Sequence, residues 1–380
     1  MNELSKTLDP TVLPQATSPA MQADNHTRLW LRTARVSLIG LALLFAFFDL
    51  FQFHVPTPIQ AGLYLAGMVA LNLPHGGFEH FSNLTRRSLA FSIRYVVGFL
   101  FFIALFIALF FISPTAGLSL AILMAILKGG GGDLKVMDAA TGSRHLKNKA
   151  QRLLAIIARG APVMLIPMVA HQADFQMFAQ MMINMFSDTA TSGASVAALM
   201  TQLSPLIIAA VAGILTLHLG LGLYQALNHR NRADALADWA RDGLDTLILA
   251  VFFTCVPVLV AVGMYFPFWY SARQVARSLS VKQDIEPEPG AFLVMLEHMQ
   301  PVRMALYTWL ILMIGALITA VIAGAILLLM PNPFIHQNWL YNGVGFWTIF
   351  ISIIALPHVV VGDFLDKKRG IWYAPNPHSS

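Results

Sequence analysis

Residues 90–113 read AFSIRYVVGFLFFIALFIALFFIS, and this stretch carries one charged residue, Arg94, near its start. A helix needs roughly 20 predominantly apolar residues to cross the hydrocarbon core of a bilayer. The stretch is therefore long enough to span a membrane. Of all 380 residues, 57% are hydrophobic and 11% are charged, against about 25% charged in a typical soluble domain. Because so few charges cannot cover a globular surface of this size, much of the surface must face lipid.

Comparable apolar blocks recur along the chain. Backbone polar groups in lipid must find partners within the protein, so these blocks are expected to be helices. We expect an all-α, polytopic membrane bundle of about eight (seven to nine) transmembrane helices. The domain limits follow as a polar, disordered cytoplasmic tail at 1–35, a transmembrane domain at 36–366 and a cytoplasmic C-terminal tail at 367–380. The candidate spans are 36–53, 61–74, 90–113, 115–128, 153–170, 203–224, 244–266, 304–330 and 342–362.

Lys and Arg lie in alternate loops, which sets the expected orientation. They precede the first span and follow the second, fourth and last, whereas three other loops lack them: 54–60, 171–202 and 331–341. The positive-inside rule places the basic loops in the cytoplasm. We therefore expect a multi-pass protein of the cell (inner) membrane with both termini cytoplasmic. The net charge of +5 lies in these loops, so we expect the lipid bilayer as a partner and no nucleic acid.

One apolar block conflicts with this orientation. Residues 225–243 and 267–303 both carry Arg, yet only the block 244–266 separates them. A single crossing would put these two basic segments on opposite sides of the membrane. Pro257 and Pro267 could instead break the block into a re-entrant or kinked segment.

Polar side chains at membrane depth are costly and often functional, and PHGGFEH at residues 74–80 contains three. In a helix His75 and Glu79 share a face, and His80 lies round to one side. Imidazole and carboxylate together suit iron or zinc. The alternative is an interfacial His pair beside a glycine-permitted bend. His358, in the later LPH sequence, has two similar interpretations: a functional role or a helix–helix hydrogen bond.

Two further segments contain residues that could carry chemistry. KGGGGD at residues 128–133 places Lys128 at the end of an apolar span, where snorkelling to the headgroups would explain it. Its glycines are expected to form a flexible loop after the span. They are not a phosphate loop, because no GxxxxGK(S/T) pattern follows. YFPFWYSARQ at residues 265–274 is rich in aromatics. They fit an interfacial belt, or Phe266 and Trp269 line a flat apolar substrate site.

These segments resemble the Brp/Blh family of membrane β-carotene 15,15'-dioxygenases. Residues 74–80 are similar to its PHGxxDH motif, 128–133 stand where it has HFGxxD, 265–274 resemble YFxxWHSxRH and 356–358 resemble its late LPH. The resemblance implies a non-haem Fe(2+) held by four histidines. It also implies O₂-dependent cleavage of the central double bond of β-carotene, which gives two molecules of retinal. A cavity open to lipid would admit this membrane-soluble substrate.

The chain departs from the family pattern at the expected iron ligands. His75 matches the first ligand, but Lys128, Tyr270 and Gln274 replace the other three, and Glu79 replaces an Asp. A protonated Lys has no lone pair, Tyr binds as a phenolate and Gln is a weak ligand. The resemblance therefore leaves it open whether the chain is an active enzyme.

Three interpretations follow from these departures. The chain is a carotenoid dioxygenase with a metal site rebuilt from His75, Glu79, His80 and His358, if the last span packs near the second. It is alternatively a non-catalytic protein that binds or delivers a carotenoid or retinal. The third interpretation is an unrelated transporter, which the lack of an internal repeat disfavours.

Overall fold

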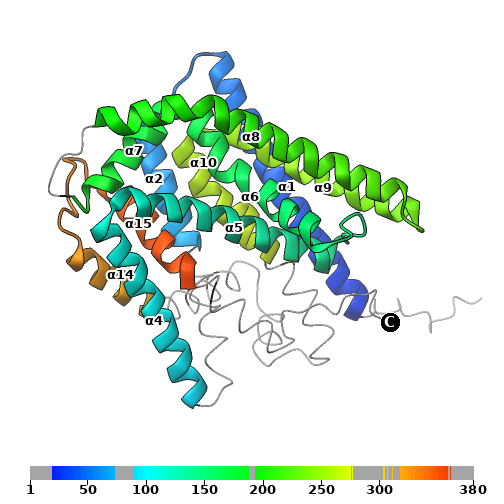
Figure 1. Cartoon of the computed structure of the whole chain (residues 1–380), viewed down its shortest axis with the longest axis horizontal. Helices are drawn as coiled ribbons and strands as arrows, with labels where there is room; N and C mark the ends of the chain where they lie inside the picture. Colours follow the sequence, from blue (N-terminus) through cyan, green and yellow to red (C-terminus); the bar gives the residue numbers. More distant parts are fainter. Residues whose placement is uncertain are drawn as a thin grey trace, which may run out of the picture.

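The computed structural model describes residues 19–72, 89–187, 193–274 and 317–357, together with residues 276, 303, 306, 310 and 360. Within these ranges every regular element is a helix. Six of the helices are long and apolar enough to cross a membrane, and two shorter apolar helices accompany them. The chain is therefore an all-α, polytopic membrane bundle, as the sequence predicts (Figure 1).

The helices follow the apolar blocks, and several extend beyond the predicted limits. The first begins well before residue 36, and the fourth predicted span continues far past residue 128. The elements are α1 (Pro19–Leu50), α2 (Thr57–Leu65), the π-helix η1 (Ala66–Asn72), α4 (Leu89–Ile112), α5 (Pro114–Ala140), α6 (Lys149–Ala170), α7 (Gln172–Asn184), α8 (Gly193–Leu227), α9 (Arg232–Cys255), α10 (Val258–Tyr265), the π-helix η2 (Phe266–Ser271), α14 (Leu317–Leu329) and α15 (Trp339–Pro357).

Two of the helix starts are set by local sequence. The side chain of Asn148 accepts a hydrogen bond from the backbone N–H of Gln151 at 2.9 Å and caps α6. Ser113 caps α5 in the same way, and Pro114 follows at the first helical position. Asn and Ser are preferred caps because a side-chain oxygen satisfies an unpaired N–H, and Pro loses no hydrogen bond there.

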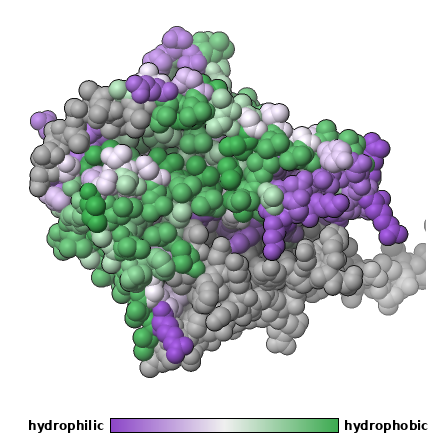
Figure 2. Space-filling model, in the orientation of Figure 1, coloured by the Kyte–Doolittle hydropathy of each residue, from purple (hydrophilic) through white to green (hydrophobic). Residues whose placement is uncertain are grey.

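The outer surface of the bundle is apolar. On α4 the side chains of Phe101 and Leu105 are exposed, and Ile112 is 82% exposed. Figure 2 shows hydrophobic surface over the middle of the molecule and hydrophilic surface gathered at the end where α8 meets α9. Contiguous apolar surface of this extent is not tolerated in water. It matches the lipid-facing surface that the composition predicts.

The glycine run at residues 129–132 is part of helix α5, so the prediction of a flexible loop is wrong. Close packing against α6 explains the glycines. A Cβ atom at Gly130 would lie 1.8 Å from the carbonyl oxygen of Ile156, and one at Gly160 would lie 2.0 Å from that of Ile126. Small residues let helix backbones approach closely in membranes. The glycines therefore bring α5 and α6 into backbone contact.

The apolar block 244–266 is not a single crossing. α9 ends at Cys255, Val256 is extended and Pro257 caps α10, because Pro lacks the N–H that would continue the helix. Arg273 Nη1 then returns to within 2.8 Å of Asp245 Oδ2 in α9. The chain has therefore reversed direction, as Figure 1 also shows.

The reversal at Pro257 means that the block 244–266 does not place its two ends on opposite sides of the bundle as a single crossing would. Arg241 lies one turn before Asp245 on α9, and Arg273 contacts Asp245 after the reversal. Arg273, the first basic residue after η2, thus lies against the middle of α9. The block 244–266 contains the end of α9 and the whole of α10, which run antiparallel with the turn at Val256.

Candidate functional site

Two of the motif segments meet inside the bundle. Tyr270 and Gln274 are four residues apart at the end of η2, and both side chains lie against Gly132 of α5. A Cβ atom at Gly132 would lie 2.9 Å from Gln274 Nε2 and 2.9 Å from Tyr270 Cε2. Lys128 is half-buried and lies one helical turn before Gly132, on the same face of α5. The fold therefore brings together the three positions at which the sequence replaces expected histidines.

The aromatic residues of the second segment are mostly buried. Tyr265 is 1% exposed and Trp269 is 0% exposed, so these two side chains do not belong to an interfacial belt. The Arg273 guanidinium lies 4.5 Å from the centroid of the Trp269 ring, close enough for a cation–π interaction. Phe266 is half-buried and packs against buried hydrophobic side chains of the core. The role of Phe266 and Trp269 in lining a substrate site stays a prediction.

Both short π-helices lie beside this region. η2 contains Trp269 and Tyr270, and η1 leads directly toward residue 75. η1 packs closely on α10, since a Cβ atom at Gly67 would lie 2.0 Å from the carbonyl oxygen of Gly263. π-helical turns are rare and frequently occur at functional sites. Four predicted ligands lie outside the residues that the structure describes: His75, Glu79, His80 and His358.

The positions that the structure describes do not fit a four-histidine iron site. Lys128, Tyr270 and Gln274 offer an ammonium, a phenol and an amide where imidazoles would be needed. An ammonium repels a cation, and an amide is a weak ligand. Over the described ranges no three His, Cys, Asp or Glu side chains are grouped so that they could hold a metal ion. These three described side chains therefore do not fit the histidine ligands that the resemblance implies.

A buried charged centre lies directly beside these positions. Arg159 Nε lies 2.6 Å from Asp133 Oδ2, and the same guanidinium contacts Asp242 and Asp245. The group is balanced, with three cations and three carboxylates. Its members are Arg35 on α1, Asp133 on α5, Arg159 on α6, Asp242 and Asp245 on α9, and Arg273 after η2. Charges at membrane depth are expensive unless they are paired, and here they neutralise one another.

Sequence reasoning missed this charged centre. Asp133 and Arg273 lie within the quoted motifs, next to the expected ligand positions. The available signal was Arg159, an ionisable residue inside the candidate span 153–170, because such a residue marks a functional or paired site by default. Its partners could not be named, because Asp242 and Asp245 lie more than 80 positions along the chain.

Two histidines extend the charged centre. His145 Nε2 and His218 Nε2 lie 2.8 and 3.0 Å from the same carboxylate oxygen of Asp242. Both side chains are almost completely buried. Arg159 contacts the other oxygen of Asp242, so both oxygens of this carboxylate have charged or polar partners. We interpret the two histidines as polar partners of Asp242.

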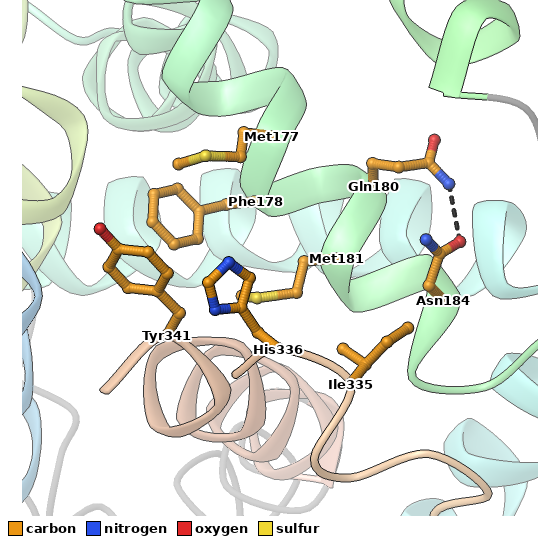
Figure 3. Close-up of a pocket in the computed structure, with 8 residues that line it drawn as sticks. All are labelled: Met177, Phe178, Gln180, Met181, Asn184, Ile335, His336 and Tyr341. Carbon is orange, nitrogen blue, oxygen red and sulfur yellow. Dashed lines mark hydrogen bonds between the residues drawn. The ribbon is translucent and has the colours of Figure 1, made fainter. Parts of the chain in front are cut away.

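A shallow pocket of about 200 Å³ lies elsewhere, between α7 and the segment that leads into α15 (Figure 3). The side chains of Tyr341 and His336 approach each other there, with ring centroids 4.8 Å apart. Ligand sites usually enclose about 300–1,000 Å³, and no residue of the quoted motifs lines this pocket. It therefore does not bear on the candidate site. Its lining residues are Met177, Phe178, Gln180, Met181, Asn184, Ile335, His336 and Tyr341.

The fold and the site together define a class of protein. Apolar helices cross the membrane, and a neutralised polar centre lies within the bundle beside the motif residues. A model of the family described as "Beta-carotene 15,15'-dioxygenase" matches residues 66–366, and the chain belongs to this family. This confirms the resemblance that the motifs indicate.

Two curated relatives come from Halobacterium salinarum. "Probable beta-carotene 15,15'-dioxygenase Brp" is 44% identical over 349 residues, which cover 91% of this chain and 94% of that protein. "Probable beta-carotene 15,15'-dioxygenase Blh" is 27% identical over 327 residues, which cover 83% and 87%. No solved structure matches the chain.

Proposed function

We propose that this protein cleaves β-carotene to retinal within the membrane, as a β-carotene 15,15'-dioxygenase. In this reaction the central double bond breaks, and each half keeps one atom of O₂ as an aldehyde oxygen. The observation that carries the proposal is the 44% identity, across 91% of the chain, to a protein named as a probable enzyme of this kind. The apolar surface of the bundle suits a substrate that dissolves in lipid.

Any iron would have to be held by donors other than Lys128, Tyr270 and Gln274. We propose His75, Glu79, His80 and His358 for this role, since imidazole and carboxylate suit non-haem Fe(2+). Iron bound there would supply the activation of O₂ that the cleavage requires.

The packing of the second and last spans supports this donor set. The Tyr64 hydroxyl on α2 lies 2.6 Å from Thr348 Oγ1 on α15. α2 and α15 run in the same direction (Figure 1). His75 follows Tyr64 by 11 residues, and His358 follows Thr348 by 10 residues. The chain thus meets the condition that the last span packs near the second.

One observation favours a second candidate function. Tyr270 and Gln274 lie against Gly132, and Lys128 lies one helical turn before it on α5, where the family pattern has iron ligands. A protein that kept the carotenoid-binding cavity and lost the metal would bind or deliver a carotenoid or retinal without cleaving it. The two candidates differ in iron content and in product, so one experiment separates them.

The test is expression of the chain in bacterial cells that make β-carotene. We expect the orange colour to fade, retinal to appear by liquid chromatography, and the purified protein to contain iron. His75→Ala should reduce both retinal and iron to background. His229→Ala, in the loop between α8 and α9, is the matched control and should change neither.

Other results would reject the cleavage function. Cells that stay orange, and an iron-free protein that retains a polyene through purification, would establish the binding role instead. A protein that yields neither product nor bound polyene would contradict both candidate functions.

A further inference from the structure

One arginine side chain joins three parts of the bundle. Arg273 Nε lies 2.5 Å from Asp133 Oδ1 on α5, and Arg273 Nη1 lies 2.8 Å from Asp245 Oδ2 on α9. The guanidinium also lies over the ring of Trp269 in η2. Arg273 is 1% exposed, so water does not compete for these contacts. The segment after η2 is thereby tied to α5 and α9 at once.

These ties lie directly beside the candidate site. Asp133 follows Gly132, and Arg273 precedes Gln274. Gly132 has no side chain that could interlock with η2, and its neighbours there are the side chains of Tyr270 and Gln274. The ion pairs of Arg273 add directional contacts from the end of η2 to α5 and α9.

Buried ion pairs are weak evidence for stability, because desolvation offsets much of their attraction. Their best-attested use is to specify register between packed elements. Arginine suits this use, since its planar fork can engage two carboxylates in fixed geometry. Arg273 donates one hydrogen bond, from Nη1 to Asp245 Oδ2, and its Nε forms an ion pair with Asp133 Oδ1.

We propose that Arg273, anchored by Asp133 and Asp245, is a positioning residue that sets the register of η2 against α5. It thereby holds Tyr270 and Gln274 beside Gly132 and one turn from Lys128. Its importance for turnover rests on the proposed function. The register itself does not, so the two can be tested separately.

The first variant is Arg273→Lys, which keeps the buried charge and loses the fork. A second variant, Arg273→Gln with Asp245→Asn, keeps the buried charges balanced and covers the case in which the first fails to fold. The matched control is Arg241→Lys, because Arg241 contacts Asp238 on α9, outside the buried charged centre, and is 49% exposed. Folding is checked by gel filtration in detergent.

Register is measured by crosslinking, without substrate. Gly132→Cys and Gln274→Cys are introduced together with Cys255→Ser, which removes the one native cysteine. A short bis-thiol reagent should crosslink this reporter in high yield. In the folded Arg273 variant the yield should fall at least about fivefold, and in Arg241→Lys it should not change.

Retinal formation is measured in the same variants without the reporter cysteines. Arg273→Lys should lower it by about 10- to 100-fold, since small displacements caused by mutations away from the reacting atoms have effects of this size. The inference is overturned if Arg273→Lys retains crosslinking, or if crosslinking is lost while retinal formation is unchanged. It is also overturned if Arg241→Lys loses as much crosslinking. If the unmodified chain forms no retinal, the proposed function fails and the crosslinking still decides the register.

Discussion

At the scale of single residues, the protein depends on a few buried charges. Arg159 faces Asp133, Asp242 and Asp245 and is almost completely buried. Removing one partner from such a group leaves uncompensated charge in a region of low dielectric constant. By contrast, Arg152 pairs with Asp138 where both side chains are partly exposed, and such pairs contribute little.

Arg159→Ala should therefore lower the free energy of unfolding by about 3–5 kcal/mol, or prevent folding. Arg152→Ala should lower it by less than about 1 kcal/mol. Both can be compared by unfolding the purified protein in detergent with denaturant. Equal effects of the two substitutions would show that the buried charged centre contributes no more to the free energy of unfolding than a partly exposed ion pair.

At the scale of elements, close approach of helix backbones places the site. α5 and α6 touch at Gly130 and Gly160, and η1 touches α10 at Gly67. Where a Cβ atom would meet backbone, the helices must separate to admit it. Other glycines of the same run are free of this constraint: around Gly131 there is nothing within 4 Å of a Cβ position.

Gly160→Ala should destabilise the protein by about 1–3 kcal/mol, the usual cost of overpacking. Gly131→Ala should be neutral or stabilise by up to about 1 kcal/mol, because Ala is the better helix former. Thermal unfolding in detergent measures both. Tolerance of Ala at residue 160 would mean that α5 and α6 are not held in backbone contact.

At the scale of the whole molecule, contacts along α8 place the connecting segments at two opposite ends of the bundle. α8 has 35 residues and is roughly 50 Å long. Near its start Gln172 Nε2 lies 2.9 Å from Thr201 Oγ1, so α7 lies at that end. His336 and Tyr341 line the pocket on α7, which places the segment before α15 there too. The loop after α8, at residues 228–231, lies at the opposite end.

The orientation of these ends is predicted from loop charge. In intact cells that carry Cys255→Ser, a membrane-impermeant thiol reagent should label Gln337→Cys and should not label Asn228→Cys. After the membrane is permeabilised, both should be labelled. Labelling of Asn228→Cys alone in intact cells would invert the predicted orientation, and labelling of both would exclude opposite ends.

Much of the molecule could be predicted from local sequence. Hydrophobic length is a local property, so the apolar blocks indicated the membrane bundle and most of its helices. The motif around Tyr270 and Gln274 likewise marked residues that the structure brings next to Gly132. The four glycines were misassigned because their composition is that of a loop. Only the carbonyl of Ile156, on another helix, explains why Gly130 is required.

The sequence by itself determined that the chain belongs in a lipid bilayer, which apolar blocks form helices and which family motifs it carries. The tertiary structure alone decided that the chain reverses at Pro257 and that Arg273 joins Asp133 to Asp245. The physical reason is that burial in lipid depends on neighbouring residues, whereas the pairing of a buried charge depends on which distant segment packs against it. A charged residue within an apolar helix sequence indicates that a partner is needed, but that sequence does not identify the partner.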